Sequence, residues 1–343
     1  MPEWFFPFRC RAGYIWKSIR HNLTNVFTTS LLVLHEDTIV YERYFHGRTK
    51  DTPQAMFSVT KSVISALVGI AVKDGMIRGV HQKVTDFFPD AKITDERKCE
   101  MTIEHLLTMR SGLPGDSDRQ DIPWWQAEDS GLVAFEMPLA AAPGERFAYS
   151  SGPGMQALAC LISRAVNQNL FEYAKEKLFE PLDMHSVKWD AADDGANYGG
   201  FGISMTSKDM LRFGQLYLNE GRWDGAQILP EGWVESSIPC GLKDHRGYGY
   251  GYLFRQIEAK HPDTYQAQGQ FGQFIDISPE RNAVIVRTGC PGPFVTACMK
   301  TLNFLQNRQL KLRHLKTLFE MQGVPLDYLA NIHMEKTKGA SHG

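Results

Sequence analysis

Runs of alternating hydrophobic and polar residues lie near both ends of the chain, and they predict β-hairpins. Two pairs of runs are rich in β-branched and aromatic residues, residues 31–35 with 38–45 and residues 274–278 with 283–287. Each pair is joined by a short polar turn, which is typical of adjacent antiparallel strands. Residues 247–252 alternate glycine and tyrosine with a period of two, which predicts a further strand.

The middle of the chain carries hydrophobic residues at helical spacing. Three residues that commonly begin a helix precede such segments: Thr102, Pro153 and Thr206. We expect an α/β fold of the α+β type, with a mostly antiparallel sheet flanked by helices and an inserted all-helical domain. Residues 1–79 and 241–343 would form the sheet-containing domain and residues 80–240 the helical domain, with the active site in the cleft between them. Residues 295–315 also have helical spacing.

One segment is apolar on nearly every side. Residues 63–72 contain no charged side chain, which predicts a helix that is buried all round. Ser58 and Lys61 precede this segment and are three positions apart, so both project from one face of the first helical turn. The helix dipole at this end favours negative charge that develops on a serine oxygen.

A serine and a lysine on one helical face can form a catalytic pair. A serine hydroxyl is a weak nucleophile until an adjacent base removes its proton, and a lysine can be that base where desolvation favours its neutral form. Ser58 would then be the nucleophile and Lys61 the base. The alternative is that Ser58 only caps the helix, because the same spacing also arises by chance in a chain of this length.

Composition limits the classes of partner. The chain has 343 residues, of which 43% are hydrophobic, so it can bury a large core. Its formal net charge of −2 gives no field that would gather nucleic acid or an anionic membrane, and we expect a small-molecule substrate. The six cysteines include no CxxC pair and indicate free thiols in a reducing compartment.

Segments that direct a protein to a membrane or bind a metal are not found in the sequence. No window approaches about 18 apolar residues, the length that a membrane span requires. The first residues lack the continuous apolar region of a signal peptide, so we expect a cytoplasmic protein. There is no HExxH or other metal-binding spacing, and we expect no metal and no cofactor.

Three motifs together resemble the serine β-lactamase-like superfamily, which includes class C β-lactamases, penicillin-binding proteins and esterases. Its members carry SxxK at the head of a central helix, then a tyrosine-containing triplet, then a glycine-containing triplet on a strand. The corresponding segments follow in the same order, at residues 58–61, 149–151 and 267–269. Residues 101–113 and 201–214 also resemble segments of this family. The Tyr-Ser-Ser-Gly form of the second motif is nearest to the branch of nylon-oligomer (6-aminohexanoate-dimer) hydrolases.

The resemblance implies roles for individual residues. Tyr149 would relay protons between the nucleophile and the leaving group. The main-chain amides of Ser58 and Gln270 would form the oxyanion hole. Residues expected to bind substrate are Ser151, Gly269, Trp125 and Trp189.

Each of these residues also has a purely structural interpretation. Tyr149 could be a packed aromatic residue, and Ser151 could cap the helix that begins near Pro153. Gly269 could mark a bulge, and tryptophans more often pack in a core than contact a ligand.

Two positions depart from the family pattern. Ser151 stands where class C enzymes usually have asparagine, and Ala267 replaces the lysine or histidine of the third motif. A cation that could hold a substrate carboxylate is therefore missing at residue 267, which argues against β-lactams as the main substrate.

The expected function is that of a serine hydrolase, a carboxylesterase or amidase, which cleaves an amide or ester bond of a small molecule through an acyl-Ser58 intermediate. The alternatives are a weak β-lactamase, a D-amino-acid peptidase, or a non-catalytic binding or scaffold protein that kept the fold.

Overall fold

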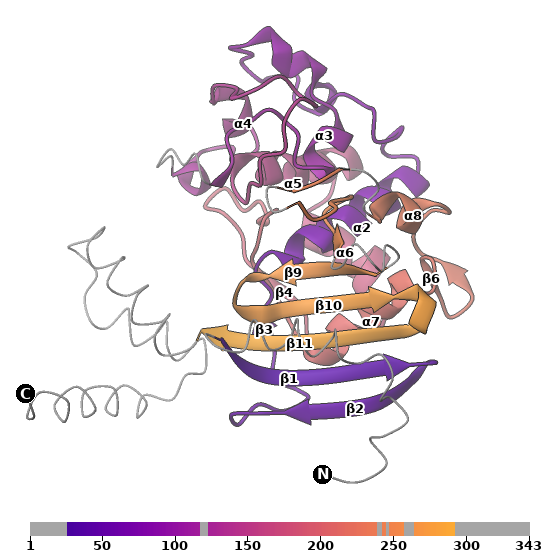
Figure 1. The fold of residues 1–343 in the computed structure, drawn as a ribbon. Helices are drawn as coiled ribbons and strands as arrows, with labels where there is room; N and C mark the ends of the chain where they lie inside the picture. The colour runs from indigo at the N-terminus through magenta and orange to yellow at the C-terminus, as the bar shows by residue number, and fades with distance from the viewer. Residues whose placement is uncertain (1–25, 117–122, 239–241, 245–246, 257–263, 292–343) are drawn as a thin grey trace, which may run out of the picture. The chain divides into compact units, whose positions relative to one another are not determined.

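The computed structural model (Figure 1) describes residues 26–116, 123–238, 242–244, 247–256 and 264–291. The chain divides into two compact units, Ser30–Arg287 and a second unit of Met1–Thr29 with Thr288–Gly343. Only residues 26–29 and 288–291 of the second unit are described, so the account below concerns Ser30–Arg287. The helix predicted at residues 295–315 lies outside the described residues. The division into a sheet-containing domain and a helical domain stays a prediction.

A six-stranded sheet has the strand order β2-β1-β11-β10-β9-β8. Its strands are β1 (Val26–His35), β2 (Thr38–Tyr44), β8 (Arg255–Gln256), β9 (Tyr265–Gly269), β10 (Gln273–Ser278) and β11 (Ala283–Pro291). The pairs β1/β2, β8/β9, β9/β10 and β10/β11 are antiparallel. Both predicted hairpins are confirmed. In the first, Glu36 and Asp37 have φ values of 48° and 57°, as a type I′ turn between twisted strands requires.

Short strands form two smaller sheets. One has the order β3-β5-β4 and the other pairs β6 with β7. Their bounds are β3 (Gln54–Ala55), β4 (Lys188–Trp189), β5 (Ile203–Met205), β6 (Arg222–Trp223) and β7 (Ala226–Gln227). Immediately after β3, the amide of Met56 donates to the carbonyl of Ile203. This bond ties the segment before Ser58 to β5.

The strand predicted at residues 247–252 is wrong. Among the residues that the structure describes, this segment makes isolated bridges and no ladder, Lys243 with Gly249 and Tyr250 with Arg255. Its backbone groups bond to separate partners, since the amide of Tyr250 donates to the carbonyl of Leu242 and that of Gly251 to the carbonyl of Phe254. Alternation of residue types alone could not reveal these separate partners.

The α-helices in the described part of the chain are α2 (Val59–Lys73), α3 (Ile103–Leu107), α4 (Val133–Glu136), α5 (Pro153–Val166), α6 (Leu170–Ala174), α7 (Ser207–Leu218) and α8 (Trp233–Ser237). The predicted starts of α3, α5 and α7 are confirmed. Thr102 caps α3 in a capping box with His105, and the Thr206 hydroxyl accepts from the amide of Asp209 at the start of α7. Proline occupies the first turn of α5, where its missing N–H costs nothing.

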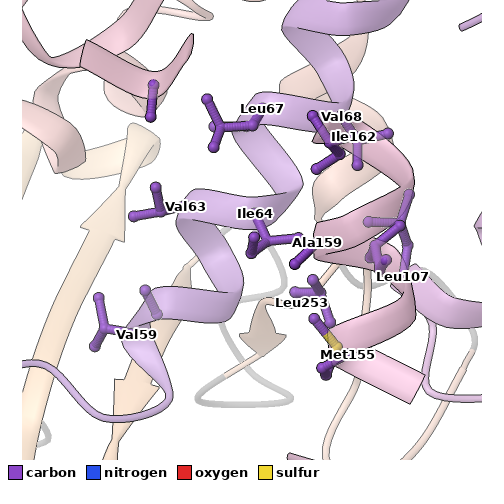
Figure 2. Close-up of a cluster of buried hydrophobic side chains, with 14 of the residues drawn as sticks. Val59, Val63, Ile64, Leu67, Val68, Leu107, Met155, Ala159, Ile162 and Leu253 are labelled. Carbon is purple, nitrogen blue, oxygen red and sulfur yellow. The ribbon is translucent and has the colours of Figure 1, made fainter. Parts of the chain in front are cut away.

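Helix α2 is buried on every side, as the sequence predicts. Every residue from Val59 to Ala71 is buried, and α2 contacts both β9 and α5. Figure 2 shows Ile64 and Val68 pointing toward Ala159 and Ile162 of α5, whereas Val63 points to the opposite side. Burial of each large aliphatic side chain contributes about 1.5–3 kcal/mol. The helix is therefore a rigid base for the residues at its N-terminal end.

Candidate active site

The backbone turns sharply just before helix α2. Phe57 has φ = 49°, an uncommon conformation for a bulky residue and one that must be held by its surroundings. Its ring packs edge-on against Phe271, with the ring centroids 5.1 Å apart. Ser58 follows at the N-cap position, but its side chain makes no capping hydrogen bond. The interpretation of Ser58 as a simple cap is therefore wrong, and its hydroxyl faces Lys61 instead.

Lys61 lies one helical turn after Ser58 and is only 1% exposed. Its Nζ atom donates to Ser58 Oγ at 2.8 Å, to Ser151 Oγ at 3.0 Å and to the carbonyl of Gly200 at 2.9 Å. These acceptors satisfy the three N–H bonds of an ammonium group. The structure thus brings the serine and lysine of the first motif together with Ser151 of the second.

Ser151 is held by a carboxylate. Its main-chain amide donates to Asp116 Oδ1 at 2.8 Å, and its hydroxyl donates to Asp116 Oδ2 at 2.9 Å. The N-cap of α5 is Gly152, with no side-chain cap, so the interpretation of Ser151 as the helix cap is wrong. Its side chain instead bridges Lys61 and Asp116.

Tyr149 lies against the same lysine. Lys61 Nζ is 4.8 Å from the centroid of the Tyr149 ring, and the Arg255 guanidinium carbon is 5.2 Å from it. Burial raises the pKa of the Tyr149 phenol, but the charge of Lys61, hydrogen bonding with Ser58 and Lys61, and the charge of Arg255 together lower that pKa below its ordinary value.

The third motif approaches Ser58 through its glycine. A Cβ atom at Gly269 would lie 2.2 Å from the carbonyl oxygen of Met56, a distance that any side chain would violate. Glycine at the end of β9 therefore allows this strand to lie against the segment that leads into α2. Gln270 comes next in the chain, at the start of the 3₁₀ turn Gln270–Gly272.

The two predicted tryptophans are not brought to this group of residues. Trp189 is 7% exposed, packs with Phe171 and Phe179, and donates to the carbonyl of Tyr198 at 2.9 Å. Trp125 is 42% exposed. Within the described residues, no hydrogen bond or ring contact joins either tryptophan to Ser58, Lys61 or Tyr149.

Sequence reasoning missed three residues near this site. Asp116 accepts from Ser151, and the carbonyl of Gly200 accepts from Lys61. Neither residue belongs to a motif. The third is Arg255, which donates to Gln268 Oε1 at 2.8 Å and lies 3.8 Å from the buried carboxylate of Asp244. Ala267 is fully buried and brings no charge, so Arg255 is a cation beside Tyr149 that the third motif did not reveal.

The described residues can also be compared with the requirements of a metal site, a reactive thiol and a membrane-spanning helix. In this part of the chain, no three His, Cys, Asp or Glu side chains lie close enough to hold a metal ion. Cys99 and Cys160 are free thiols. Burial raises the pKa of the Cys160 thiol to about 12. None of the described helices is both long enough and apolar enough to cross a membrane.

Comparisons with known proteins identify relatives in sequence and in fold. The chain is 24% identical to the 6-aminohexanoate-dimer hydrolase of Paenarthrobacter ureafaciens over 294 residues, which cover 78% of this chain and 74% of that protein. Its fold is similar to that of a class C beta-lactamase, with a TM-score of 0.65 and 15% identity over 82% of this chain and 90% of the other.

A further solved structure has the same fold. It is EstCE1, described as a hydrolase with promiscuous acyltransferase activity, with a TM-score of 0.63 and 16% identity over 80% of this chain and 90% of the other. The Beta-lactamase family model matches residues 19–288, which include all the residues of the candidate site and all of the sheet except the last three residues of β11. The chain therefore belongs to the beta-lactamase family.

Proposed function

We propose that this protein is a serine hydrolase that cleaves an amide or ester bond of a small molecule through an acyl-Ser58 intermediate. The observation that supports this proposal most directly is the 2.8 Å contact between Lys61 Nζ and Ser58 Oγ. A general base must lie within about 2.6–3.2 Å of the group whose proton it takes. The Ser58 hydroxyl also has no capping role that would compete with this contact.

The acylation step uses the residues at the start of α2. Ser58 Oγ attacks the substrate carbonyl carbon while its proton passes to Lys61 Nζ, and the carbonyl oxygen becomes an oxyanion. In the second half of the step, the proton passes to the leaving nitrogen or oxygen through Tyr149, and the bond from the carbonyl carbon to that atom breaks. The lowered pKa of Tyr149 supports this role, because such a phenol exchanges protons more readily near neutral pH.

The oxyanion would be held by two main-chain amides. Ser58 N and Gln270 N are the candidates, because Gly269 brings the end of β9 against the segment before Ser58. Among the backbone hydrogen bonds that link different elements of the described chain, none uses either amide. Loss of one such donor typically costs about 3 kcal/mol of transition-state stabilisation.

Deacylation reverses these proton movements. Water attacks the acyl carbon, its proton passes to Lys61 or Tyr149, and the Ser58–acyl bond breaks as Ser58 regains a proton. The products are a carboxylic acid and the regenerated enzyme. The name of the 24%-identical relative, a 6-aminohexanoate-dimer hydrolase, supports amides among the substrates to be tested.

The proposal can be tested with a fluorophosphonate probe followed by intact-mass measurement. We expect wild type to gain one phosphonyl adduct with loss of fluoride, and Ser58→Ala to react about a thousandfold more slowly or not at all. Ser236→Ala is the matched control, because Ser236 is exposed and lies outside the candidate site. A panel of amides, esters and nitrocefin then identifies the bond that is cleaved. Equal labelling of wild type and Ser58→Ala would contradict the proposed nucleophile.

A further inference from the structure

Asp116 holds a position that the reaction scheme above does not use. We propose that Asp116 is a positioning residue which, through the Ser151 hydroxyl, fixes the direction in which Lys61 accepts a proton. This inference rests on the proposed function, because it concerns the base that activates Ser58.

The argument begins with the single hydrogen of the Ser151 hydroxyl. A carboxylate only accepts hydrogen bonds, so the 2.9 Å contact between Ser151 Oγ and Asp116 Oδ2 commits that hydrogen to Asp116. Ser151 Oγ can then offer only its lone pairs to Lys61 Nζ, which lies 3.0 Å away. Asp116 thus makes Ser151 an obligatory acceptor for the lysine.

The Gly200 carbonyl is the second obligatory acceptor. It lies 2.9 Å from Lys61 Nζ, and a carbonyl oxygen has no hydrogen to donate. A Cβ atom at Gly200 would lie 2.2 Å from the carbonyl oxygen of Ser151, so glycine permits the close approach of these two segments. The two acceptors are therefore held beside each other.

These two acceptors determine where the neutral lysine has its lone pair. A neutral amine has two N–H bonds and one lone pair, and the two N–H bonds are taken by Ser151 Oγ and the Gly200 carbonyl. The lone pair of Lys61 Nζ therefore points at Ser58 Oγ, 2.8 Å away. The Ser58 O–H bond then breaks as the new N–H bond forms on Lys61, while Asp116 neither gains nor loses a proton.

The backbone fixes Asp116 in this role. Its own amide donates to the carbonyl of Tyr149 at 2.8 Å, and its Oδ1 atom accepts from the amide of Ser151 at 2.8 Å. Asp116 is therefore bonded to both ends of the Tyr149–Ser151 segment. Without the carboxylate, the Ser151 hydroxyl could turn and donate to Lys61, which would occupy the lone pair that Ser58 needs.

A double-mutant cycle tests the inference, with the second-order rate of fluorophosphonate labelling as the readout. Asp116→Asn keeps an oxygen that can accept from the Ser151 amide, but its NH₂ group can donate to Ser151 Oγ. We expect the labelling rate of Asp116→Asn to be at least about tenfold below that of wild type. The labelling rate of Ser151→Ala should also be lower than that of wild type. In the Ser151→Ala background, Asp116→Asn should change the labelling rate by less than about twofold, because the hydroxyl that links residue 116 to Lys61 is absent.

Asp193→Asn is the matched control, since it removes the same charge from an exposed residue outside the site and should label at the wild-type rate. The thermal midpoint of each variant shows whether it is folded. An equal effect of Asp116→Asn in both backgrounds would overturn the inference and leave the proposed function standing. A Ser151→Ala variant that labels at the wild-type rate would also overturn it, even if Asp116→Asn did not fold. Wild type that labels no faster than Ser58→Ala would overturn both proposals.

Discussion

The chemistry of Tyr149 depends on its charged neighbours. Burial raises its pKa, but Lys61, the hydrogen bonding around it and Arg255 lower it more, so the pKa is below that of a free tyrosine. Among the other groups around it, Tyr250 interacts with Tyr149 and also with Asp244, the ion-pair partner of Arg255. Because the pKa is lowered, the phenolate persists to lower pH than in a free tyrosine.

Arg255→Met should therefore move the pH dependence of acylation. The variant loses a positive charge that lowers the pKa of Tyr149, so that pKa rises and proton transfer through Tyr149 shifts to higher pH. Arg255→Lys keeps the charge and should move the profile less. Stopped-flow labelling from pH 6 to 10 measures both profiles, and coincident curves for wild type and Arg255→Met would count against this role.

At the scale of single residues, sequence reasoning found the groups that belong to motifs. Ser58, Lys61, Tyr149 and Ser151 lie together as expected, whereas Asp116 does not belong to a motif. Asp116 is 35 residues from Ser151 in the chain, and its contact depends on how the intervening segment folds. No local pattern of residue types encodes such a contact, so it had to come from the structure.

At the scale of elements, boundaries set by local chemistry were predictable. The capping residues Thr102 and Thr206 begin helices because their hydroxyls accept from nearby amides. The segment 247–252 failed as a strand because the bonds of its backbone groups are divided between residues before it, such as Leu242, and residues after it, such as Phe254. Periodicity reports which face of an element is buried, but not which backbone partner it finds.

The burial of α2 gives a prediction about stability. Ile64 is fully buried, so Ile64→Ala should lower the free energy of unfolding by about 2–5 kcal/mol, through lost burial and the cavity that remains. Met76, just beyond the helix, is 52% exposed, and Met76→Ala should change the same quantity by about 0.5 kcal/mol or less. Urea titrations followed by circular dichroism measure both values. A loss below about 1 kcal/mol for Ile64→Ala would show that the helix is not the rigid base described above.

At the scale of the whole molecule, the site is assembled from distant parts of the chain. Lys61 bonds to Ser151, 90 residues away, and to Gly200, 139 residues away. These contacts lie inside the unit Ser30–Arg287 and join α2 to segments before α5 and β5. The Lys61 contacts therefore require nearly the whole unit to be folded.

We accordingly expect the reactivity of Ser58 and the fold to be lost together. In a urea titration, the rate of fluorophosphonate labelling and the tryptophan fluorescence should fall in a single transition with the same midpoint, as a cooperative domain requires. Labelling that is lost at clearly lower urea than the fluorescence change would show that the site opens before the unit unfolds.

The enclosure of Lys61 has a consequence for chemical surveys of proteins. Lys61 is 1% exposed and its amine is surrounded by three acceptors, so a bulky electrophile such as an activated ester has no approach to the nitrogen. Lysine-directed reagents will tag the surface lysines of this protein and leave the one beside Ser58 unmarked. Profiling of lysine reactivity across a proteome would thus overlook this site, and only a serine-directed reagent would find it.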